Sequence, residues 1–220
     1  MTSVFKAWIG GLVLTALLAA VAVAWIDKPV APLVHGLFEQ QSFANEAAHS
    51  PGLSIPFISG AVFAVFGLAA LLGRKFSRLE SNILLCNISL LAVEPIKNLL
   101  KFVYGRTWPD SWAPGILSLI HDNEFGFHFF HGGKSYESFP SGHAATAAAV
   151  MSVLWIAYPK LRIAWAFFIV AADVGLVLLN LHFVSDVVVG TFVGASTGLF
   201  TAALCTPKTW LGSRLQGTQQ

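Results

Sequence analysis

Apolar residues along the 220-residue chain fall into six segments, each separated from the next by polar or basic residues. The segments cover about residues 7–26, 51–73, 81–103, 142–158, 163–181 and 184–205. Most approach the roughly 20 apolar residues with which an α-helix crosses the hydrocarbon core of a bilayer. The pattern therefore predicts an all-α integral membrane protein, a six-transmembrane-helix bundle in which residues 1–220 form a single domain.

The first apolar segment has a second interpretation, as a secretory signal peptide. Lys6 precedes it, and Ala22-Val23-Ala24 is similar to a cleavage site. Its apolar run is longer than the ~7–15 residues of a signal-peptide core, which favours a membrane span. The mixed residues 27–50 that follow are then a first external loop.

Basic residues indicate the orientation of the bundle, because short cytoplasmic connections are enriched in Lys and Arg. They collect at one set of segment ends: Lys6, residues 74–78, Lys160, Arg162, Lys208 and Arg214. Both termini are therefore expected in the cytoplasm. The long loop of about residues 104–140 is expected at the outer, periplasmic face of an inner membrane.

Composition agrees with a membrane protein and limits its partners. Hydrophobic residues make up 55% of the chain and charged residues 11%, whereas a soluble domain has about 25% charged residues. The net charge of +2 is too small to indicate a nucleic-acid partner. Cys86 and Cys205 lie far apart within apolar segments, which favours buried reduced thiols over a disulfide. The expected surroundings are membrane lipids, and nothing in the sequence specifies an oligomeric state.

Three groups of polar residues lie where apolar segments meet the predicted outer surface. They are Lys101 with Arg106 and Pro109, Ser141-Gly142-His143, and His182 with Asp186. A single histidine in such a place could simply cap a helix or lie at the interface. Three groups at one membrane face favour a functional site.

The second group opens the helix predicted from residue 142. Pro140, Ser141 and Gly142 leave backbone N–H groups exposed at a helix start, and those donors and the helix dipole favour an anion. His143 adds a titratable group at the same place. A proton donor beside an anion site indicates phosphate chemistry.

The third group has the spacing of a histidine oriented by a carboxylate. Asp186 is four positions after His182, so one helical face carries both side chains. The carboxylate can then fix the imidazole tautomer and stabilise the imidazolium. An unpaired carboxylate inside an apolar helix costs about 2.5–3.5 kcal/mol, which favours a functional role for Asp186.

Together these residues resemble the motifs of the type 2 phosphatidic acid phosphatase superfamily, which also contains the vanadium haloperoxidases. The resemblance covers about residues 94–190 and consists of Lys101-x4-Arg106-x2-Pro109, Pro140-Ser141-Gly142-His143 and His182-x3-Asp186. It implies that His182 attacks phosphorus and forms a phosphohistidine, that Asp186 orients His182, and that His143 is the general acid. It also implies that Lys101, Ser141 and the Gly142 backbone N–H bind the phosphoryl oxygens, without a metal ion or another cofactor.

The chain departs from the family pattern at two places. The usual Arg before the Pro of the first motif is Trp108, within Gly-Arg-Thr-Trp-Pro, and the usual Ser-Arg of the third motif is Gly175-Leu176. Arg106 is the candidate for a replacement phosphate clamp, because a guanidinium can bind phosphate through two parallel hydrogen bonds. The further polar groups close in sequence are Lys134, Lys97 and Asn180.

Other polar and aromatic residues have simpler interpretations. Glu94 is a local partner for Lys97 and Lys101, and Asp173 either pairs with a neighbouring helix or has a proton or substrate role. Three loop histidines and two nearby acids lack the close pairing of zinc motifs, so we expect no metal site at His121, His128, His131, Asp122 and Glu124. Residues 125–130, rich in Phe, are predicted to form a membrane-dipping lid.

The expected function is dephosphorylation of a lipid phosphate or lipid pyrophosphate through a phosphohistidine. Candidate substrates are phosphatidic acid, phosphatidylglycerol phosphate, undecaprenyl phosphate or pyrophosphate, and a phosphate of lipid A. One alternative is a phosphotransferase that passes the phosphoryl group from His182 to another lipid. Another is a non-catalytic protein that binds or transports lipid, for which the two missing arginines are the support.

Overall fold

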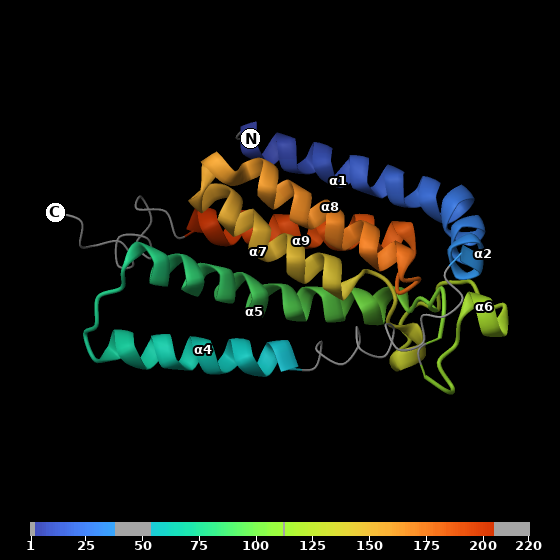
Figure 1. Ribbon diagram of the computed structural model, residues 1–220, viewed down its shortest axis with the longest axis horizontal. Coiled ribbons are helices and arrows are strands. Elements are labelled where there is room, and N and C mark those ends of the chain that lie inside the picture. Colours follow the sequence, from blue (N-terminus) through green and yellow to red (C-terminus); the bar gives the residue numbers. More distant parts are fainter. Residues whose placement is uncertain (1–2, 38–53, 112, 205–220) are drawn as a thin grey trace.

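The computed structural model describes residues 3–37, 54–111 and 113–204, and these residues are mainly helical, without a β-strand (Figure 1). The predicted all-α class is therefore confirmed. The main helices are α1 Ser3–Val21, α2 Asp27–Leu37, α4 Ser54–Leu71, α5 Arg78–Tyr104, α7 Gly142–Ala157, α8 Arg162–Leu178 and α9 Val184–Leu204. Shorter elements are a π-helical segment Ala22–Ile26, α6 Leu119–Asp122, and the 3-10 turns Lys134–Tyr136 and Pro159–Leu161.

Each of the six apolar segments contains a helix, but the helices differ in length. Among the described residues, four helical stretches are long and apolar enough to cross a membrane: Ser3–Leu37, Arg78–Tyr104, Pro159–Leu178 and Val184–Leu204. The apolar helices of the second and fourth segments are shorter, at Phe57–Leu71 and Gly142–Ala157. The structure thus gives four candidate spans, and the predicted number of six stays a prediction.

The first helical stretch continues further than expected. Residues 27–37 form α2, so the prediction of an external loop from residue 27 is wrong for this part of the chain. Asp27 suggested an end to the helix, because a carboxylate is costly within apolar surroundings. Its side chain is instead buried against Arg106, with 2.9 Å between Oδ2 and Nη2, and this pairing offsets the cost. The remainder of that loop lies outside the described residues, as do Trp112, Cys205 and the basic residues Lys208 and Arg214.

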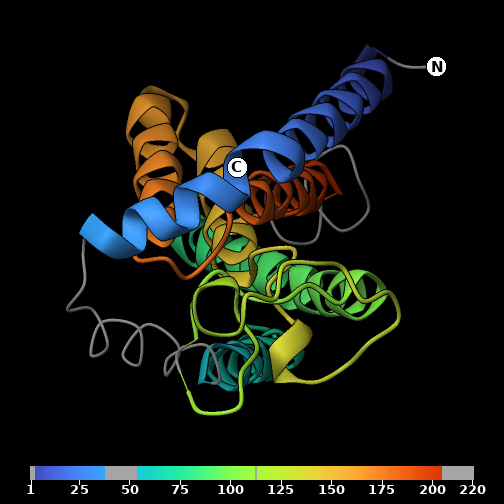
Figure 2. The same ribbon diagram turned by 90° about the vertical axis from the view of Figure 1, so that its right-hand side faces the viewer.

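Helices α7 and α9 lie in the middle of the bundle (Figures 1 and 2). Helix α7 packs against α9, α5 and α8, helix α1 crosses α9, and α4 packs on the far side of α5. The loops between α5 and α7, with the short α6, gather at one end of the bundle. Large apolar side chains remain exposed on the outer faces of α1, α4 and α8, as expected of surfaces that contact lipid.

The contact between α7 and α9 is unusually close because α9 presents glycines to the alanines of α7. Gly190, Gly194 and Gly198 recur every fourth residue, so they share one face of α9. A Cβ on Gly194 would overlap the carbonyl oxygen of Ala145, and one on Gly198 would overlap that of Ala149. Small residues at such a contact let two membrane helices approach closely. This packing fixes the first turns of α7 and α9 relative to each other.

Polar groups within the apolar helices form hydrogen bonds to neighbouring helices. Asp173 of α8 accepts a hydrogen bond from the Thr191 hydroxyl of α9 at 2.7 Å, which favours its structural interpretation. Asn87 of α5 exchanges hydrogen bonds with Ser59 of α4, both at 2.8 Å. Cys86 is a free thiol.

Candidate active site

The N-terminus of α7 forms one side of the candidate site. Ser141 is the N-cap, and its Oγ accepts a hydrogen bond from the Ala144 N–H at 3.2 Å. The Ser141 N–H donates to the main-chain carbonyl of Asp186 at 2.9 Å. The start of α7 is therefore joined to the first turn of α9 through the backbone. Backbone N–H groups at the start of a helix point away from the helix, and the helix dipole is positive there, so this end of α7 favours an anion.

Two lysines from α5 converge on this helix start. A Cβ placed on Gly142 would lie 3.4 Å from Lys97 Nζ and 3.7 Å from Lys101 Nζ. Glycine at this position therefore lets both ammonium groups approach the backbone. Lys97 also pairs with Glu94 at 2.7 Å, which confirms the local partnership expected of Glu94 for Lys97. The helix start and the ammonium groups of Lys97 and Lys101 form a compact anion site, which we call the phosphate cradle.

His182 lies beside this cradle, in the short connection between α8 and α9. Its ring centroid is 5.9 Å from that of His143, and its side chain is buried. His182 Nδ1 lies 3.7 Å from Asp186 Oδ2, so the two side chains predicted to act together face each other. The second ring nitrogen, Nε2, is then the atom available to a substrate.

Burial controls the protonation of His182. Removal from water lowers the pKa of the imidazole below its ordinary value of 6.5, and the neighbouring Asp186 carboxylate opposes this shift. The balance favours a neutral ring at neutral pH. A neutral ring carries the lone pair that a nucleophile needs.

The Asp186 carboxylate is held by several donors. Its Oδ2 accepts hydrogen bonds from the Ser138 hydroxyl at 2.6 Å and from the Phe183 N–H at 3.0 Å. Its Oδ1 faces Arg106 Nη1 at 2.5 Å. These contacts orient the carboxylate and satisfy it away from water, which a buried charge requires.

Arg106 has different surroundings from those of the expected phosphate clamp. Its guanidinium is fully buried, with Nη1 bonded to Ser185 and Asp186 and Nη2 bonded to Asp27. The rings of Phe183, Phe127 and Phe125 surround it, at 4.2, 4.8 and 5.3 Å from Cζ. Because both terminal nitrogens already bind carboxylates, we propose that Arg106 positions Asp186 instead of clamping phosphate.

The two places where the family pattern has arginine are filled by apolar side chains. Trp108 is 4% exposed, its ring lies 5.2 Å from that of His182, and Lys101 Nζ lies over it at 5.9 Å. Its indole N–H donates to the Lys134 carbonyl at 2.7 Å. Leu176 packs in an apolar cluster with Ala144, Leu181 and Val187. Neither place therefore supplies a guanidinium, and the cations described at the start of α7 are Lys97 and Lys101.

The other predicted auxiliary residues divide between the site and the scaffold. Lys97 joins the cradle, as described above. Asn180 is buried, and its amide donates to the Ala31 carbonyl of α2 at 3.2 Å, so it holds the connection between α8 and α9 in place. The side chain of Lys134 is exposed, and its carbonyl accepts the bond from Trp108.

Two of the three loop histidines lie close to acidic residues. His128 Nε2 lies 3.1 Å from Glu124 and His121 Nε2 lies 2.9 Å from Asp110, which also pairs with His35 at 3.0 Å. Among the residues that the structure describes, no three His, Cys, Asp or Glu side chains are grouped so that they could hold a metal ion.

The Phe-rich residues 125–130 face in two directions. Phe125 packs on Phe183, and Phe127 packs on Phe139, with ring centroids 5.3 and 5.4 Å apart. Phe129 and Phe130 are exposed. The outer pair suits contact with a membrane surface, and the lid role stays a prediction.

Three residues of the site were not recognised in the sequence. Asp27, Ser138 and Ser185 surround Arg106 and Asp186, and each is 0–1% exposed. The available signal was the acidic Asp27 directly after an apolar segment, because a charge in that place is stable only with a partner. Ser138 directly precedes Phe139-Pro140 and Ser185 directly precedes Asp186, but hydroxyl residues are common near helix ends.

Known proteins are similar to part of this chain. Residues 82–210 match the PAP2 superfamily. A lipid A 1-phosphatase of Rhizobium johnstonii is 34% identical over 108 residues, and one of Rhizobium etli is 33% identical over 108 residues. Each aligned region covers 49% of this chain but only 41% and 43% of the two relatives, so the chain matches less than half of each. No solved structure matches it.

Proposed function

Because this chain belongs to the PAP2 superfamily, as its motifs indicated, we propose that it is a membrane phosphatase that removes phosphate from a lipid. The observation that carries the proposal is the convergence of Lys97, Lys101 and the start of α7 beside the paired rings of His182 and His143. An anion site, a neutral buried nucleophile and a second imidazole are the parts that metal-independent phosphoryl transfer requires. The basic residues at the opposite segment ends favour a site at the outer face of the inner membrane, with both termini in the cytoplasm.

In the first step, His182 Nε2 attacks phosphorus and forms a P–N bond. The P–O bond to the lipid breaks, and His143 donates a proton to the leaving oxygen. Asp186 stabilises the positive charge that develops on His182, through Nδ1. The lipid alcohol leaves, and a phosphohistidine remains.

In the second step, water attacks the phosphohistidine. His143, now neutral, accepts the proton from water, and the P–N bond breaks to regenerate His182. Inorganic phosphate leaves, so one water is consumed for each lipid phosphate. In both steps the two ammonium groups and the start of α7 stabilise the charge on the equatorial phosphoryl oxygens.

The first substrate class to test is a phosphorylated glycolipid of the lipid A kind, on its 1-phosphate. The support is the name of the two Rhizobium relatives, which is a statement about those proteins. Phosphatidic acid, phosphatidylglycerol phosphate and undecaprenyl pyrophosphate complete the panel. Purified protein in detergent with a chelator present is expected to release phosphate from at least one of them, since the proposed steps use side chains alone.

The His182→Ala variant provides the test of mechanism. It is expected to abolish phosphate release and the acid-labile phosphoenzyme, whereas His131→Ala, at an exposed loop histidine, should retain both. Retained turnover in His182→Ala would overturn the mechanism. A second labelled lipid in the assay separates hydrolysis from transfer, because transfer would phosphorylate that lipid instead of releasing phosphate.

A non-catalytic lipid-binding protein is the second candidate function. Trp108 beside His182 and Leu176 in an apolar cluster favour it, because both occupy places where the family pattern supplies a guanidinium. This candidate predicts that the wild-type protein binds lipid phosphates without turning them over.

A further inference from the structure

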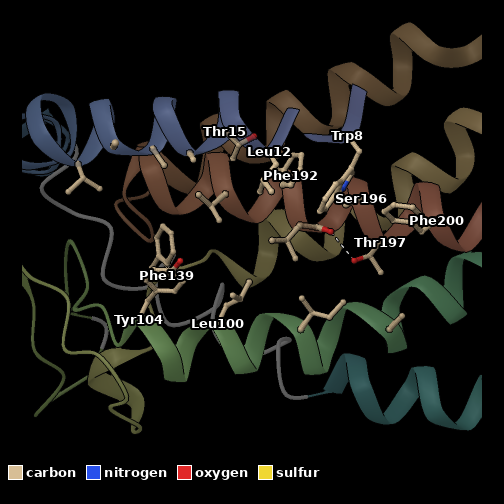
Figure 3. Close-up of a pocket in the computed structure, with 18 of the residues that line it drawn as sticks. Trp8, Leu12, Thr15, Leu100, Tyr104, Phe139, Phe192, Ser196, Thr197 and Phe200 are labelled. Carbon is tan, nitrogen blue, oxygen red and sulfur yellow. Dashed lines mark hydrogen bonds between the residues drawn. The ribbon is translucent and has the colours of Figure 1, made fainter. Parts of the chain in front are cut away.

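A groove of about 740 Å³ runs between α1, α5 and α9 (Figure 3). Its volume lies within the roughly 300–1,000 Å³ of small-molecule sites. Figure 3 shows Tyr104 and Phe139 together at one end and Trp8 and Phe200 at the other. The three helices that form it are all candidate membrane spans.

The groove exists because α1 presents small side chains to α5 and α9. Ala16, Ala19 and Ala20 line the α1 side, at helical spacings that place them on one face. At the far end, Trp8 Nε1 donates to the Ser196 hydroxyl at 3.0 Å, and the Trp8 ring lies 6.1 Å from that of Phe192. The indole therefore closes the space that the alanines leave open.

Three of the hydroxyl residues in the lining form hydrogen bonds within the protein. Ser196 accepts the bond from Trp8, and Thr197 and Thr201 each donate to a carbonyl of their own helix at 2.8 Å. These threonines then present methyl groups. A sugar, peptide or other polar ligand would find those hydrogen-bonding groups already taken, whereas a hydrocarbon chain needs none.

The outer end of the groove reaches the catalytic motif. Phe139 lines the groove and directly precedes Pro140 and Ser141, and its ring packs on Tyr104 at 4.9 Å. Helix α5 contributes to both places. Ile96 and Leu100 line the groove, while the adjacent Lys97 and Lys101 approach Gly142.

We propose that this groove holds an acyl chain of the lipid phosphate substrate while its phosphate lies in the cradle. The inference rests on the proposed function and adds a subsite for the hydrocarbon part of the substrate. The phosphate and the chain would then contact adjoining faces of α5. The chain's own residues 205–220 are poorly suited to the groove, because they include Lys208, Arg214 and several glutamines, which are costly to bury in apolar surroundings.

Filling the groove tests the proposal through chain-length selectivity. Ala16 and Ala20 are exposed, so Ala16→Phe and Ala20→Phe add bulk to the groove rather than to the helix-packed core. Ala24→Phe is the matched control, at an exposed alanine of the same helical stretch that does not line the groove. The readout is the ratio of kcat/KM for a lipid phosphate with 16-carbon chains to that for one with six-carbon chains.

Both groove variants are expected to lower this ratio roughly tenfold, because the longer chain loses its apolar contact. The ratio in Ala24→Phe should stay within about twofold of wild type. An unchanged ratio in Ala16→Phe and Ala20→Phe would overturn the proposal.

Photolabelling tests the groove without turnover. The probe is a 16-carbon lipid phosphate with a photoreactive group at the end of one chain, added to the His182→Ala protein. Labels are expected on α1 and α9 residues of the groove, and both Ala20→Phe and excess unlabelled lipid phosphate should reduce them. Competition by an uncharged diacylglycerol as strong as that by lipid phosphate would indicate a boundary lipid and overturn the proposal. Cross-links from α1 of one copy to α9 of another, with no lipid label, would indicate a second copy and overturn it too.

The two proposals fail separately. Specific, competed labelling of a protein that releases no phosphate would contradict the phosphatase function but keep the groove. Phosphate release without chain-length selectivity would contradict the groove alone.

Discussion

Asp27 and Arg106 form a fully buried ion pair, with 2.9 Å between Oδ2 and Nη2, although they lie 79 residues apart. The same guanidinium binds Asp186, which faces the proposed nucleophile His182. Ser185 completes the group by donating its hydroxyl and its N–H to Asp27. Helix α2 is thereby attached, through Arg106, to the carboxylate that faces the proposed nucleophile.

Arg106→Lys is expected to lose most activity, because one ammonium cannot reproduce the fork that serves two carboxylates. Breaking a buried pair costs about 3–5 kcal/mol, so the free energy of unfolding should also fall. Asp27→Asn should lower both quantities in the same direction, while Lys28→Gln, at an exposed neighbour, should change neither.

Kinetic measurements distinguish a positioning role for Arg106 from a mere loss of stability in the variant. At a temperature where Arg106→Lys is folded, kcat should fall with little change in KM, and the acid limb of its pH–rate profile should move, because Asp186 acts on His182. A variant that is folded and retains wild-type kcat would contradict the role. A higher KM with unchanged kcat in Arg106→Lys would indicate that Arg106 contacts the phosphate directly.

Lys97→Met is expected to weaken phosphate binding in the cradle. A hydrogen bond to a charged group contributes about 1.5–3 kcal/mol, which corresponds to roughly a 10- to 150-fold weaker inhibition by inorganic phosphate. Glu94→Gln should instead strengthen inhibition by inorganic phosphate, because it releases Lys97 from its 2.7 Å ion pair. Lys75→Met, at an exposed residue before α5, is the matched control. Equal inhibition constants for wild type and Lys97→Met would exclude the lysine from the cradle.

The acid limb of the pH–rate profile is expected below pH 6.5. Burial lowers the pKa of His182 from that ordinary value, so the ring remains neutral and nucleophilic into the acid range. Because the Asp186 carboxylate raises this pKa, Asp186→Asn should move the limb to still lower pH, and should reduce kcat on the order of 10⁴-fold, as for the carboxylate of a Ser-His-Asp triad. A general acid must carry its proton, so the proposed role of His143 predicts a rate that falls on the alkaline side. An activity that rises steadily to about pH 9 would contradict the role of His143.

The same shift predicts how stability depends on pH. With the folded-state pKa below that of the unfolded chain, the unfolded chain binds a proton at His182 that the folded protein does not. The contribution of His182 therefore lowers the free energy of unfolding as the pH falls below 6.5. The difference between wild type and His182→Gln, measured by thermal unfolding in detergent, isolates this contribution.

Gly194→Ala is expected to destabilise the protein and reduce activity. The added Cβ would overlap the Ala145 carbonyl, so α7 and α9 must separate, and such overpacking typically costs about 1–3 kcal/mol. Gly67→Ala in α4 is the control, since a Cβ there meets nothing within 4 Å. Thermal unfolding should place Gly67→Ala at or above wild type and Gly194→Ala below it. An unfolding temperature for Gly194→Ala equal to that of wild type would contradict the close contact.

The positions of the helices were predictable because membrane spans require long apolar runs, which are visible in the sequence. The pairing of His182 with Asp186 followed from their i, i+4 spacing, and Lys97 and Lys101 share a face of α5 for the same reason. Sequence spacing is therefore sufficient to predict which side chains of one helix lie on the same face.

Relationships between distant segments were not predictable in this way. Helix α2 can include Asp27 because this carboxylate pairs with Arg106 of a distant segment. No regular sequence spacing connects the two residues, so the sequence alone does not predict the pair. The sequence suggested a phosphate clamp for Arg106, because its carboxylate partners Asp27 and Asp186 come from distant segments. Similarly, the position of Trp108 beside His182 is set by the loop between α5 and α7.

The site consists of two parts. One is α7 with α9, which are joined by the backbone bond from Ser141 to Asp186 and by the close contact at the glycines of α9, and the other is α5. His143 belongs to α7 and His182 directly precedes α9, so their mutual geometry is expected to be the same before and after a substrate arrives. The lysines belong to α5, which contacts α7 less extensively than α9 does. Any motion that admits a substrate or releases phosphate is therefore expected as a displacement of α5, which would carry the charge away from a stationary nucleophile.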